Sequence, residues 1–289
     1  MKIAFIGLGT MGMPIVNNIS KKNFFIKAWD KRPIDPSKLE ANIILCQTPS
    51  ELEDCDILMT MVPDDNAIRN IAYETKVLTN KKIWINLSTT SLALLQEINK
   101  FRQNRFEYHV IPVMGRCDVA EAGQLDVYYS GNKQQLALVE PILNSFSKKI
   151  WYLNEKRETA LLTKLAGNFL LNATIEALGE AFALVEKASV ERQVFADIIM
   201  DSMFKCPVYE LYTDMIVNRK FSPPGFPLEL GLKDINLIID AGEHYRVPLP
   251  YASIVKDHFI EGMAYNEQTL DESALSISAI RHSNQTKTN

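Results

Sequence analysis

Lys164, Asn168 and Asn172 follow one another at intervals of four residues. In a helix, such positions lie on one face. Their neighbours are apolar, so an amine and two amides are costly there unless they are paired or face a cleft. A buried lysine whose pKa falls toward neutrality can take a proton from an alcohol or give one to a carbonyl oxygen. We expect this chemistry of Lys164, whereas a solvated stripe on the helix or hydrogen bonds to a neighbouring loop explain Asn172 equally well.

A second candidate is the stretch IAFIGLGTMGMP at residues 3–14, where an apolar run enters glycines spaced G-x-G-x-x-G. Gly7 permits a sharp turn, Gly9 lets the backbone approach a pyrophosphate, and Gly12 lets helix and strand pack closely. The start of the following helix attracts phosphate. A turn that binds nothing is the alternative, which the flanking strand and amphipathic segment disfavour. The expected dinucleotide-binding residues of this turn are Gly7, Leu8, Gly9, Thr10, Met11 and Gly12.

Asp30 ends the next apolar run and completes the dinucleotide-binding pattern. Its carboxylate is expected to bind the ribose hydroxyls of the cofactor and to repel a 2′-phosphate, which favours NAD. Lys31 and Arg32 follow directly, and these cations are able to grip the 2′-phosphate of NADP. We therefore expect NAD, with NADP as the open alternative.

The elements that must position these residues change character along the chain. In the first half, short apolar runs alternate with the amphipathic stretches 90–102 and 134–147; the runs are 3–6, 24–29, 56–62, 82–87, 106–113, 127–129 and 150–153. This alternation predicts an α/β fold, a Rossmann dinucleotide-binding domain over residues 1–157 with a parallel sheet covered on both faces. The close spacing of the last runs leaves antiparallel or mixed pairing open.

Residues 158–188 keep a single helical period and predict a long helix of about 45 Å that links two domains. Pockets form at such junctions, which strengthens the functional interpretation of Lys164. Further helices are expected at 192–217, 228–245, 250–265 and 271–281. The chain is thus predicted to contain a second, all-α domain over residues 158–289.

Composition narrows the class of protein. The 289 residues carry a formal net charge of -4, which provides no basic footprint for nucleic acid. We see no apolar run near the roughly 20 residues that span a membrane, and no secretory leader. The four histidines and four cysteines are scattered, so no metal site is expected. These features indicate a cytoplasmic protein with reduced thiols and a small-molecule partner.

Six segments occur in the order that is typical of one enzyme family. They are GLGTMGMP (7–14), TMVPDD (60–65), INLSTTS (85–91), IPVMGR with AEAGQL (111–125), KLAGNFLLNATIEALGEAFAL (164–184) and LGLKDINL (230–237). Together they resemble the β-hydroxyacid dehydrogenase family, the 3-hydroxyisobutyrate dehydrogenase-like proteins that are related to the NAD-binding domain of 6-phosphogluconate dehydrogenase. The similarity covers about residues 1–275.

The resemblance implies an NAD(P)-dependent oxidoreductase and assigns roles by position. It makes Lys164 the general acid/base and Asn168 a residue that orients the substrate. The implied further cofactor contacts are Met61, Val62, Pro63, Ser88 and Lys233, and the implied substrate site is Ser88, Met114, Gly115, Arg116, Lys164 and Asn168. From the residues alone, Lys233 and Asp234 suit an exposed charged pair, and Asp234 is expected to be structural. The resemblance also implies that the second domain, residues 158–289, serves the substrate and dimerisation, and that the protein is a homodimer or homotetramer.

One departure concerns the substrate. Family members carry serine-glycine-glycine where this chain has Met114-Gly115-Arg116. Arg116 is able to bind a carboxylate or phosphate in a bidentate manner, or to pair with Asp118 or Glu121; both interpretations stay open.

Three functions follow. The first is oxidation of a small β-hydroxyacid or reduction of its semialdehyde. The second is reduction of another carbonyl, such as glyoxylate, succinic semialdehyde or a bulkier ketone. The third is an NAD(P)-binding sensor or scaffold without chemistry, which the pair Lys164 and Asn168 disfavours.

Overall fold

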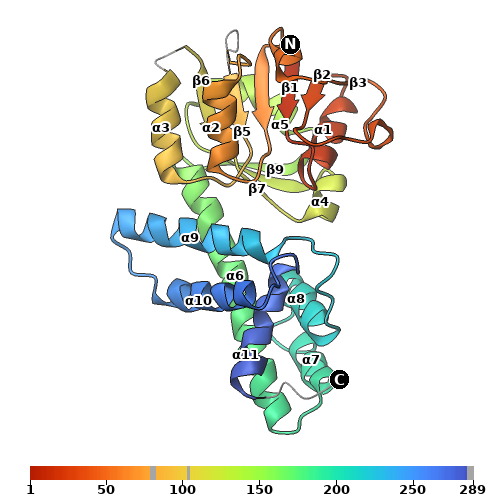
Figure 1. Ribbon diagram of the computed structural model, residues 1–289, viewed down its shortest axis with the longest axis vertical. Coiled ribbons are helices and arrows are strands. Elements are labelled where there is room, and N and C mark those ends of the chain that lie inside the picture. Colours follow the sequence, from red (N-terminus) through yellow and green to blue (C-terminus); the bar gives the residue numbers. More distant parts are fainter. Residues whose placement is uncertain (79–82, 103–104, 285–289) are drawn as a thin grey trace. The chain divides into compact units, whose positions relative to one another are not determined.

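The computed structural model describes residues 1–78, 83–102 and 105–284 (Figure 1). The chain divides into two compact units, Met1–Lys164 and Leu165–Asn289. The division falls inside helix α6 (Thr159–Lys187), the long helix expected at 158–188. The domain boundary expected at 157/158 stays a prediction.

The first unit is built on a parallel sheet with the strand order β3-β2-β1-β4-β5-β6. Every neighbouring pair in it is parallel, which confirms the predicted α/β fold. The strands are β1 (Lys2–Ile6), β2 (Phe25–Trp29), β3 (Ile43–Leu45), β4 (Ile57–Thr60), β5 (Ile83–Asn86) and β6 (Glu107–Val110). Residue 82 of the expected strand 82–87 lies outside the described residues.

Helices α1 (Gly12–Ser20), α2 (Asp65–Glu74) and α3 (Leu92–Arg102) connect strands of this sheet. The 3₁₀ turns η1 (Pro36–Lys38) and η2 (Pro49–Leu52) flank β3. Asp64 begins α2 by accepting a hydrogen bond from the Ala67 N–H at 2.8 Å. Neither β3 nor α2 was predicted from the sequence, because β3 has three residues and α2 buries only a narrow apolar stripe.

A second sheet, β7-β8-β9, corrects the expectation for the last strands. Its strands are β7 (Val113–Met114), β8 (Leu125–Tyr129) and β9 (Ser147–Tyr152); β7 runs antiparallel to β8, and β9 runs parallel to it. The run 106–113 is therefore two strands in different sheets. Ile111 still donates its N–H to the Asn86 carbonyl at 2.8 Å, but Pro112 has no N–H with which to continue the ladder.

Two helices connect the strands of this second sheet, α4 (Cys117–Glu121) and α5 (Lys133–Leu143). The helix expected at 134–147 is thus too long, since Ser147 already begins β9. Both sheets share one hydrophobic core, in which β1 side chains such as Phe5 and β8 side chains such as Val127 are fully buried. The second sheet is therefore packed within the first unit.

The second unit is helical, as predicted. After α6 it contains α7 (Arg192–Met200), α8 (Pro207–Val217), α9 (Leu228–Tyr245), α10 (Pro250–Ala264), η3 (Glu272–Ser276) and α11 (Ile277–His282). The range of α9 equals the predicted one. The single helix expected at 192–217 is wrong, because Pro207 begins a separate helix at its first position. The helix expected at 271–281 begins as a 3₁₀ turn.

Helices α9 and α10 pack side by side. A Cβ on Gly231 of α9 would lie 2.6 Å from the Phe259 ring of α10, so glycine permits this close approach.

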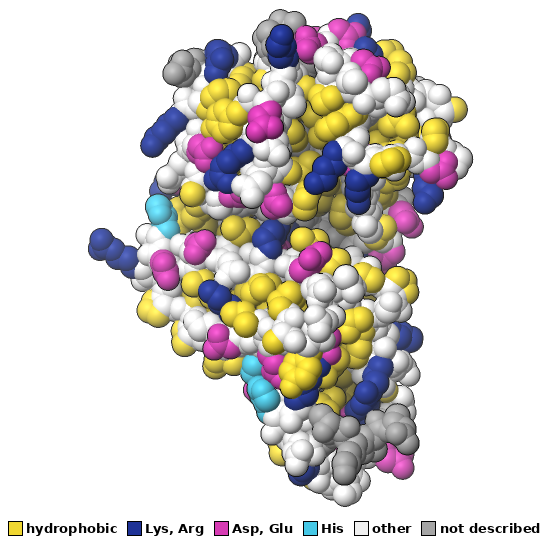
Figure 2. All heavy atoms as spheres, viewed as in Figure 1, with side chains coloured by type: hydrophobic (Ala, Val, Ile, Leu, Met, Phe, Trp, Pro, Cys, Tyr) yellow, Lys and Arg dark blue, Asp and Glu magenta, His cyan; other side chains and the backbone are white. Residues whose placement is uncertain are grey.

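On the face shown in Figure 2, acidic and basic side chains are interspersed.

Helix α6 is long and apolar enough to cross a membrane by length and composition alone, which corrects the expectation that no such run exists. Within its apolar window, 44% is buried inside the structure. Its side chains Leu161, Ile175 and Phe182 are fully buried. A core helix of a globular protein passes the same test, so length and composition alone do not make α6 a membrane span.

Candidate active site

The glycine turn packs tightly between β1 and α1. Gly7 has a φ of +99°, in the left-handed region that favours glycine. A Cβ there would lie 2.1 Å from the Met61 carbonyl oxygen, and one on Gly12 would lie 1.9 Å from the Gly7 carbonyl oxygen. A side chain at Gly7 or Gly12 would therefore displace backbone.

Gly9 differs from the other two glycines. A Cβ at Gly9 would meet only the Arg32 Nη2, at 3.4 Å. The space next to Gly9 is therefore open, and a Cβ would fill it without disturbing the fold. It lies beside the start of α1, whose first turn contains no acidic residue. These residues fit the pyrophosphate of a dinucleotide.

Asp30 is held at the end of β2 by several donors. Its Oδ2 accepts the Leu8 N–H at 2.7 Å, and its Oδ1 accepts the Arg32 N–H at 2.9 Å and Nε at 3.2 Å. Burial raises the pKa of Asp30, but the hydrogen bonds from Arg32 and Leu8 outweigh burial and hold the pKa below its ordinary value. The carboxylate is ionised at neutral pH, and the Arg32 guanidinium forms an ion pair with it.

The loop after β4 and the segment after β5 meet through one hydroxyl. The Val62 N–H donates to the Ser88 Oγ at 2.8 Å, and the Ser88 N–H donates to the Asn86 Oδ1 at 3.0 Å. Ser88 is 1% exposed. Met61, next to Val62, is also the residue whose carbonyl faces Gly7. The structure thus brings the predicted cofactor residues Gly7, Met61–Pro63 and Ser88 together in the first unit.

The predicted substrate segment follows β7. Gly115 has a φ of +142°, and a Cβ there would lie 2.7 Å from the Leu125 Cδ2. The position therefore requires glycine. Arg116 comes next, in extended backbone, as the N-cap of α4. The choice between an anion-binding and an ion-pairing Arg116 stays a prediction.

Lys164 lies at this segment. Its Nζ is 3.5 Å from the Met114 Sδ, and both residues belong to the first unit. A thioether is a weak, uncharged acceptor, so this contact orients the amine without neutralising it. The structure thus brings together the predicted acid/base residue and the predicted substrate segment.

Three polar residues meet in the second unit. The Asn168 Nδ2 donates to the Asp234 Oδ2 at 2.5 Å, and the Lys233 Nζ lies 3.0 Å from the Asp234 Oδ1. The Asp234 side chain is 2% exposed. The expectation of an exposed Lys233–Asp234 pair is therefore wrong. Asp234 joins two predicted site residues, Asn168 and Lys233, and the sequence analysis did not include it among the site residues.

The polar face of α6 continues beyond Asn168. Asn172 is 1% exposed, which rules out a solvated stripe, and its Nδ2 has no hydrogen-bond partner among the described residues. The Glu176 Oε1 lies 2.7 Å from the His258 Nδ1. Burial raises the pKa of Glu176, although His258 opposes the shift. The signal for Glu176 was available, since it continues the spacing of Lys164, Asn168 and Asn172.

Within residues 1–78, 83–102 and 105–284, no three His, Cys, Asp or Glu side chains are grouped to hold a metal ion.

Residues 2–154 match the family described as the NAD binding domain of 6-phosphogluconate dehydrogenase. Residues 159–277 match the family described as NAD-binding of NADP-dependent 3-hydroxyisobutyrate dehydrogenase. The chain belongs to the β-hydroxyacid dehydrogenase family. It is an NAD(P)-binding oxidoreductase, as the sequence analysis predicted.

Similar proteins match over nearly the whole chain. An uncharacterized oxidoreductase, YfjR of Bacillus subtilis, is 31% identical over 95% of this chain and 98% of its own. Glyoxylate/succinic semialdehyde reductase 1 of Arabidopsis thaliana is 25% identical over 98% of this chain and 99% of its own. The structure of Mycobacterium tuberculosis 3-hydroxyisobutyrate dehydrogenase with L-serine has a TM-score of 0.83 at 25% identity, and covers 96% of this chain and 98% of its own.

Proposed function

We propose that this enzyme transfers a hydride between a nicotinamide cofactor and a small β-hydroxyacid or its semialdehyde, with Lys164 as general acid and base. The contact that carries the proposal is the one between the Lys164 Nζ and the Met114 Sδ, at 3.5 Å. It joins an amine to the segment to which the family resemblance assigns the substrate, within the unit that also holds the glycine turn.

The residues divide the chemistry as follows. The glycine turn, Asp30, Met61–Pro63 and Ser88 would hold the nicotinamide cofactor, which would supply or accept the hydride. In reduction, the ammonium of Lys164 donates its proton to the substrate oxygen. In oxidation, the neutral amine accepts the hydroxyl proton. Charged Lys164 also stabilises negative charge that develops on this oxygen.

Asn168 orients the substrate in this proposal. The Asp234 carboxylate only accepts hydrogen bonds, so Asn168 must present its NH₂ group to Asp234. Its carbonyl oxygen is then directed away from Asp234 and is able to accept a hydrogen bond from a substrate hydroxyl. Lys233 shares the same carboxylate and is proposed as a further cofactor contact.

The substrate is proposed to carry a carboxylate. Arg116 stands where the family resemblance implies a glycine, and a guanidinium binds a carboxylate in a bidentate manner. Names of relatives support a small aldehyde acid: glyoxylate/succinic semialdehyde reductase 1 and the 2-hydroxy-3-oxopropionate reductase of Escherichia coli, which is 24% identical. A reductase of glyoxylate, succinic semialdehyde or a bulkier ketone is therefore the second candidate. The relatives do not favour the sensor without chemistry.

NAD is proposed as the preferred cofactor. The pKa of Asp30 lies below its ordinary value, so its charge persists and repels a 2′-phosphate. Arg32 donates a hydrogen bond from its Nε to this carboxylate. We also propose a homodimer or homotetramer in the cytoplasm, supported by exposed apolar side chains of the second unit such as Leu184 (71% exposed) and Met203 (91% exposed).

A substrate panel tests the proposed function. The purified enzyme is mixed with NADH or NADPH and each of methylmalonate semialdehyde, succinic semialdehyde, glyoxylate and tartronate semialdehyde, and oxidation of the cofactor is followed by absorbance. We expect turnover of at least one carboxylated semialdehyde and faster turnover with NADH. Cofactor binding without turnover across the whole panel would contradict the proposal.

A further inference from the structure

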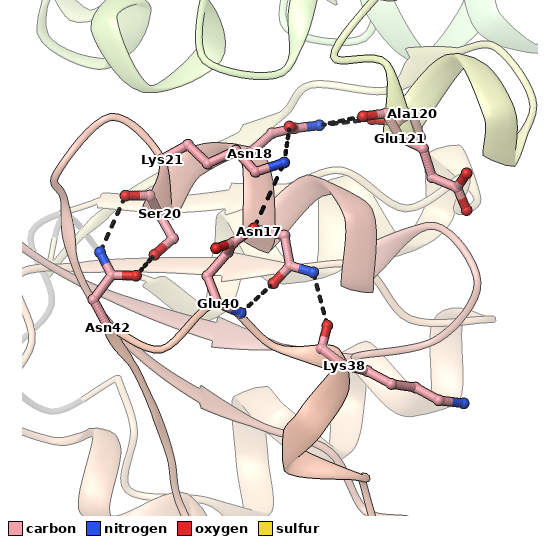
Figure 3. Close-up of polar contacts among 9 residues, drawn as sticks. All are labelled: Asn17, Asn18, Ser20, Lys21, Lys38, Glu40, Asn42, Ala120 and Glu121. Atoms are coloured by element: carbon pink, nitrogen blue, oxygen red, sulfur yellow. Dashed lines mark hydrogen bonds and ion pairs between the residues drawn. The ribbon is translucent and has the colours of Figure 1, made fainter.

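Asn18 connects the dinucleotide helix to the substrate segment. It lies on α1, the helix that begins at Gly12, and is 9% exposed. Its Nδ2 donates to the Ala120 carbonyl oxygen at 2.8 Å and approaches the Glu121 carbonyl oxygen at 3.3 Å (Figure 3). Both carbonyls belong to the end of α4, where the last carbonyls of a helix lack partners within the helix. One amide thus caps α4 from a helix that is distant in sequence.

The start of α4 is also attached to the glycine turn. The Cys117 Sγ donates to the Thr10 carbonyl oxygen, inside the glycine turn, at 3.3 Å. Ala120, between the two attachments, is fully buried and packs in the contact of α4 with α1. A helix of five residues is not stable in isolation, so its position is set by such attachments.

What α4 carries is the substrate segment. Arg116 is its N-cap, and Met114, which contacts Lys164, lies two residues earlier. Gly115, between them, fits against Leu125 and Val119 with no space for a side chain. A shift of α4 on α1 would therefore be transmitted to Met114 and Arg116.

We infer that Asn18 is a positioning residue for the substrate: by holding the Ala120 and Glu121 carbonyls, it sets where Met114–Arg116 stands relative to the glycine turn. This inference rests on the proposed function for its kinetic consequences. Asn18 itself contacts no reacting atom; it acts through α4.

Asn18→Asp is the sharpest variant because it keeps the shape of the side chain. An ionised carboxylate cannot donate a hydrogen bond, and it would face two carbonyl oxygens. Asn18→Ala removes the amide without adding charge and serves if the aspartate variant does not fold. In both variants, the Ala120 oxygen keeps only the Gly123 N–H at 3.1 Å as a donor, and the Glu121 oxygen loses the Asn18 amide.

Asn17 provides the matched control on the same helix. Its Nδ2 donates to the Lys38 carbonyl oxygen at 2.9 Å, and its Oδ1 accepts the Glu40 N–H at 3.1 Å. Figure 3 shows these contacts on the connection between β2 and β3, apart from α4. Asn17→Asp makes the same chemical change one residue away without touching the substrate segment.

The experiment compares the full-length wild type with N18D, N18A and N17D by three measurements. The first is amide hydrogen exchange of peptides that cover residues 114–125. It follows the hydrogen bonds of this segment, such as those from the Ala120 N–H to the Arg116 oxygen and from the Gln124 N–H to the Val119 oxygen. We expect faster exchange there in both Asn18 variants and wild-type exchange in N17D.

The second measurement separates KM from kcat on the best substrate of the panel. We expect the substrate KM to rise about tenfold in N18D and N18A, the size of one lost buried hydrogen bond. The cofactor Kd, from quenching of protein fluorescence, is expected to change less than about twofold, because the glycine turn keeps its own contacts. N17D is expected to match the wild type in hydrogen exchange, in the substrate KM and in the cofactor Kd.

Unchanged exchange in residues 114–125 of folded N18D and N18A would overturn the inference, as would equal changes in N17D. A lower kcat with an unchanged substrate KM would also overturn it. A wild type without turnover on the whole panel would reject the proposed function instead, and hydrogen exchange alone would then decide the role of Asn18.

Discussion

Asn168 and Asp234 are joined by a hydrogen bond of 2.5 Å between Nδ2 and Oδ2, and both side chains are buried. They come from α6 and α9, far apart in the sequence. Because the carboxylate also lies 3.0 Å from the Lys233 Nζ, one acidic residue determines the orientation of two predicted site residues.

Asp234→Ala is expected to lower kcat/KM by about tenfold or more, the size of a lost hydrogen bond to a charged group. The Asn168 amide is then free to turn, and Lys233 loses the partner at Oδ1. Steady-state kinetics on the best substrate measures the loss. Asp240→Ala, which removes an exposed acidic residue from the same helix, is the control. Equal kinetics of D234A and the wild type would remove Asp234 from the site.

Gly9→Ala is expected to keep the melting temperature and to lose cofactor affinity by about tenfold or more. Its Cβ would meet only Arg32, in the place assigned to the pyrophosphate. Gly7→Ala is the contrasting variant, because its Cβ would lie 2.1 Å from the Met61 oxygen at a left-handed φ. It is expected to lower the melting temperature by about 5 °C or more as well. Normal NADH binding by G9A would show that the pyrophosphate lies elsewhere.

Cofactor preference is expected to depend on Asp30 and Arg32 in opposite directions. Asp30→Ala removes the charge that repels a 2′-phosphate, so the ratio of kcat/KM for NADH over NADPH is expected to fall about tenfold. Arg32→Ala removes the cation from the carboxylate, and the ratio is expected to rise. Because the pKa of Asp30 is below its ordinary value, Asp30 is expected to stay ionised between about pH 6 and 8, so its titration does not change the wild-type ratio in this range. A ratio that is unchanged in D30A would contradict the assignment.

His109 is expected to make the first unit less stable in acid. Burial first, and then the Arg157 charge, lower its pKa from 6.5 to about 4, and neither ring nitrogen has a hydrogen-bond partner among the described residues. The unfolded chain therefore binds a proton more readily than the folded chain. The free energy of unfolding is therefore highest above about pH 6.5 and falls as the pH drops toward 4. At pH 5 it is lower by about 2 kcal/mol.

Urea unfolding at pH 7 and pH 5 measures this effect. His109→Phe keeps an aromatic ring against Tyr129 and is expected to lose this part of the pH dependence. His244→Phe, at an exposed position, is the control and is expected to keep it. The same acid destabilisation in H109F as in the wild type would exclude His109 as its source.

Local patterns predicted the features that depend on neighbours in sequence. The glycine spacing and Asp30 lie where the pattern placed them, beside β1 and at the end of β2, and the periodicity of residues 228–245 predicted the bounds of α9. Periodicity also predicted α6 to within a residue at each end. These features are encoded within one or two adjacent elements.

Contacts between distant segments could not be predicted in the same way. Asp234 and Asn18 look like ordinary surface residues of amphipathic helices, and only the packing of α9 on α6 and of α4 on α1 buries them. The second sheet was missed because a single residue, Pro112, ends one ladder and moves the chain to another sheet. Glu176 is the exception, since its spacing from Lys164 was visible.

Turnover of Lys164→Ala tests the central claim most directly. The variant is compared with the wild type in kcat on the best substrate, while NADH binding is measured by fluorescence on the same samples. Loss of the only proposed proton donor is expected to lower kcat by about 10²-fold or more and to leave the cofactor Kd unchanged. Turnover within a few fold of the wild type, with NADH bound normally, would contradict Lys164 as the acid and base.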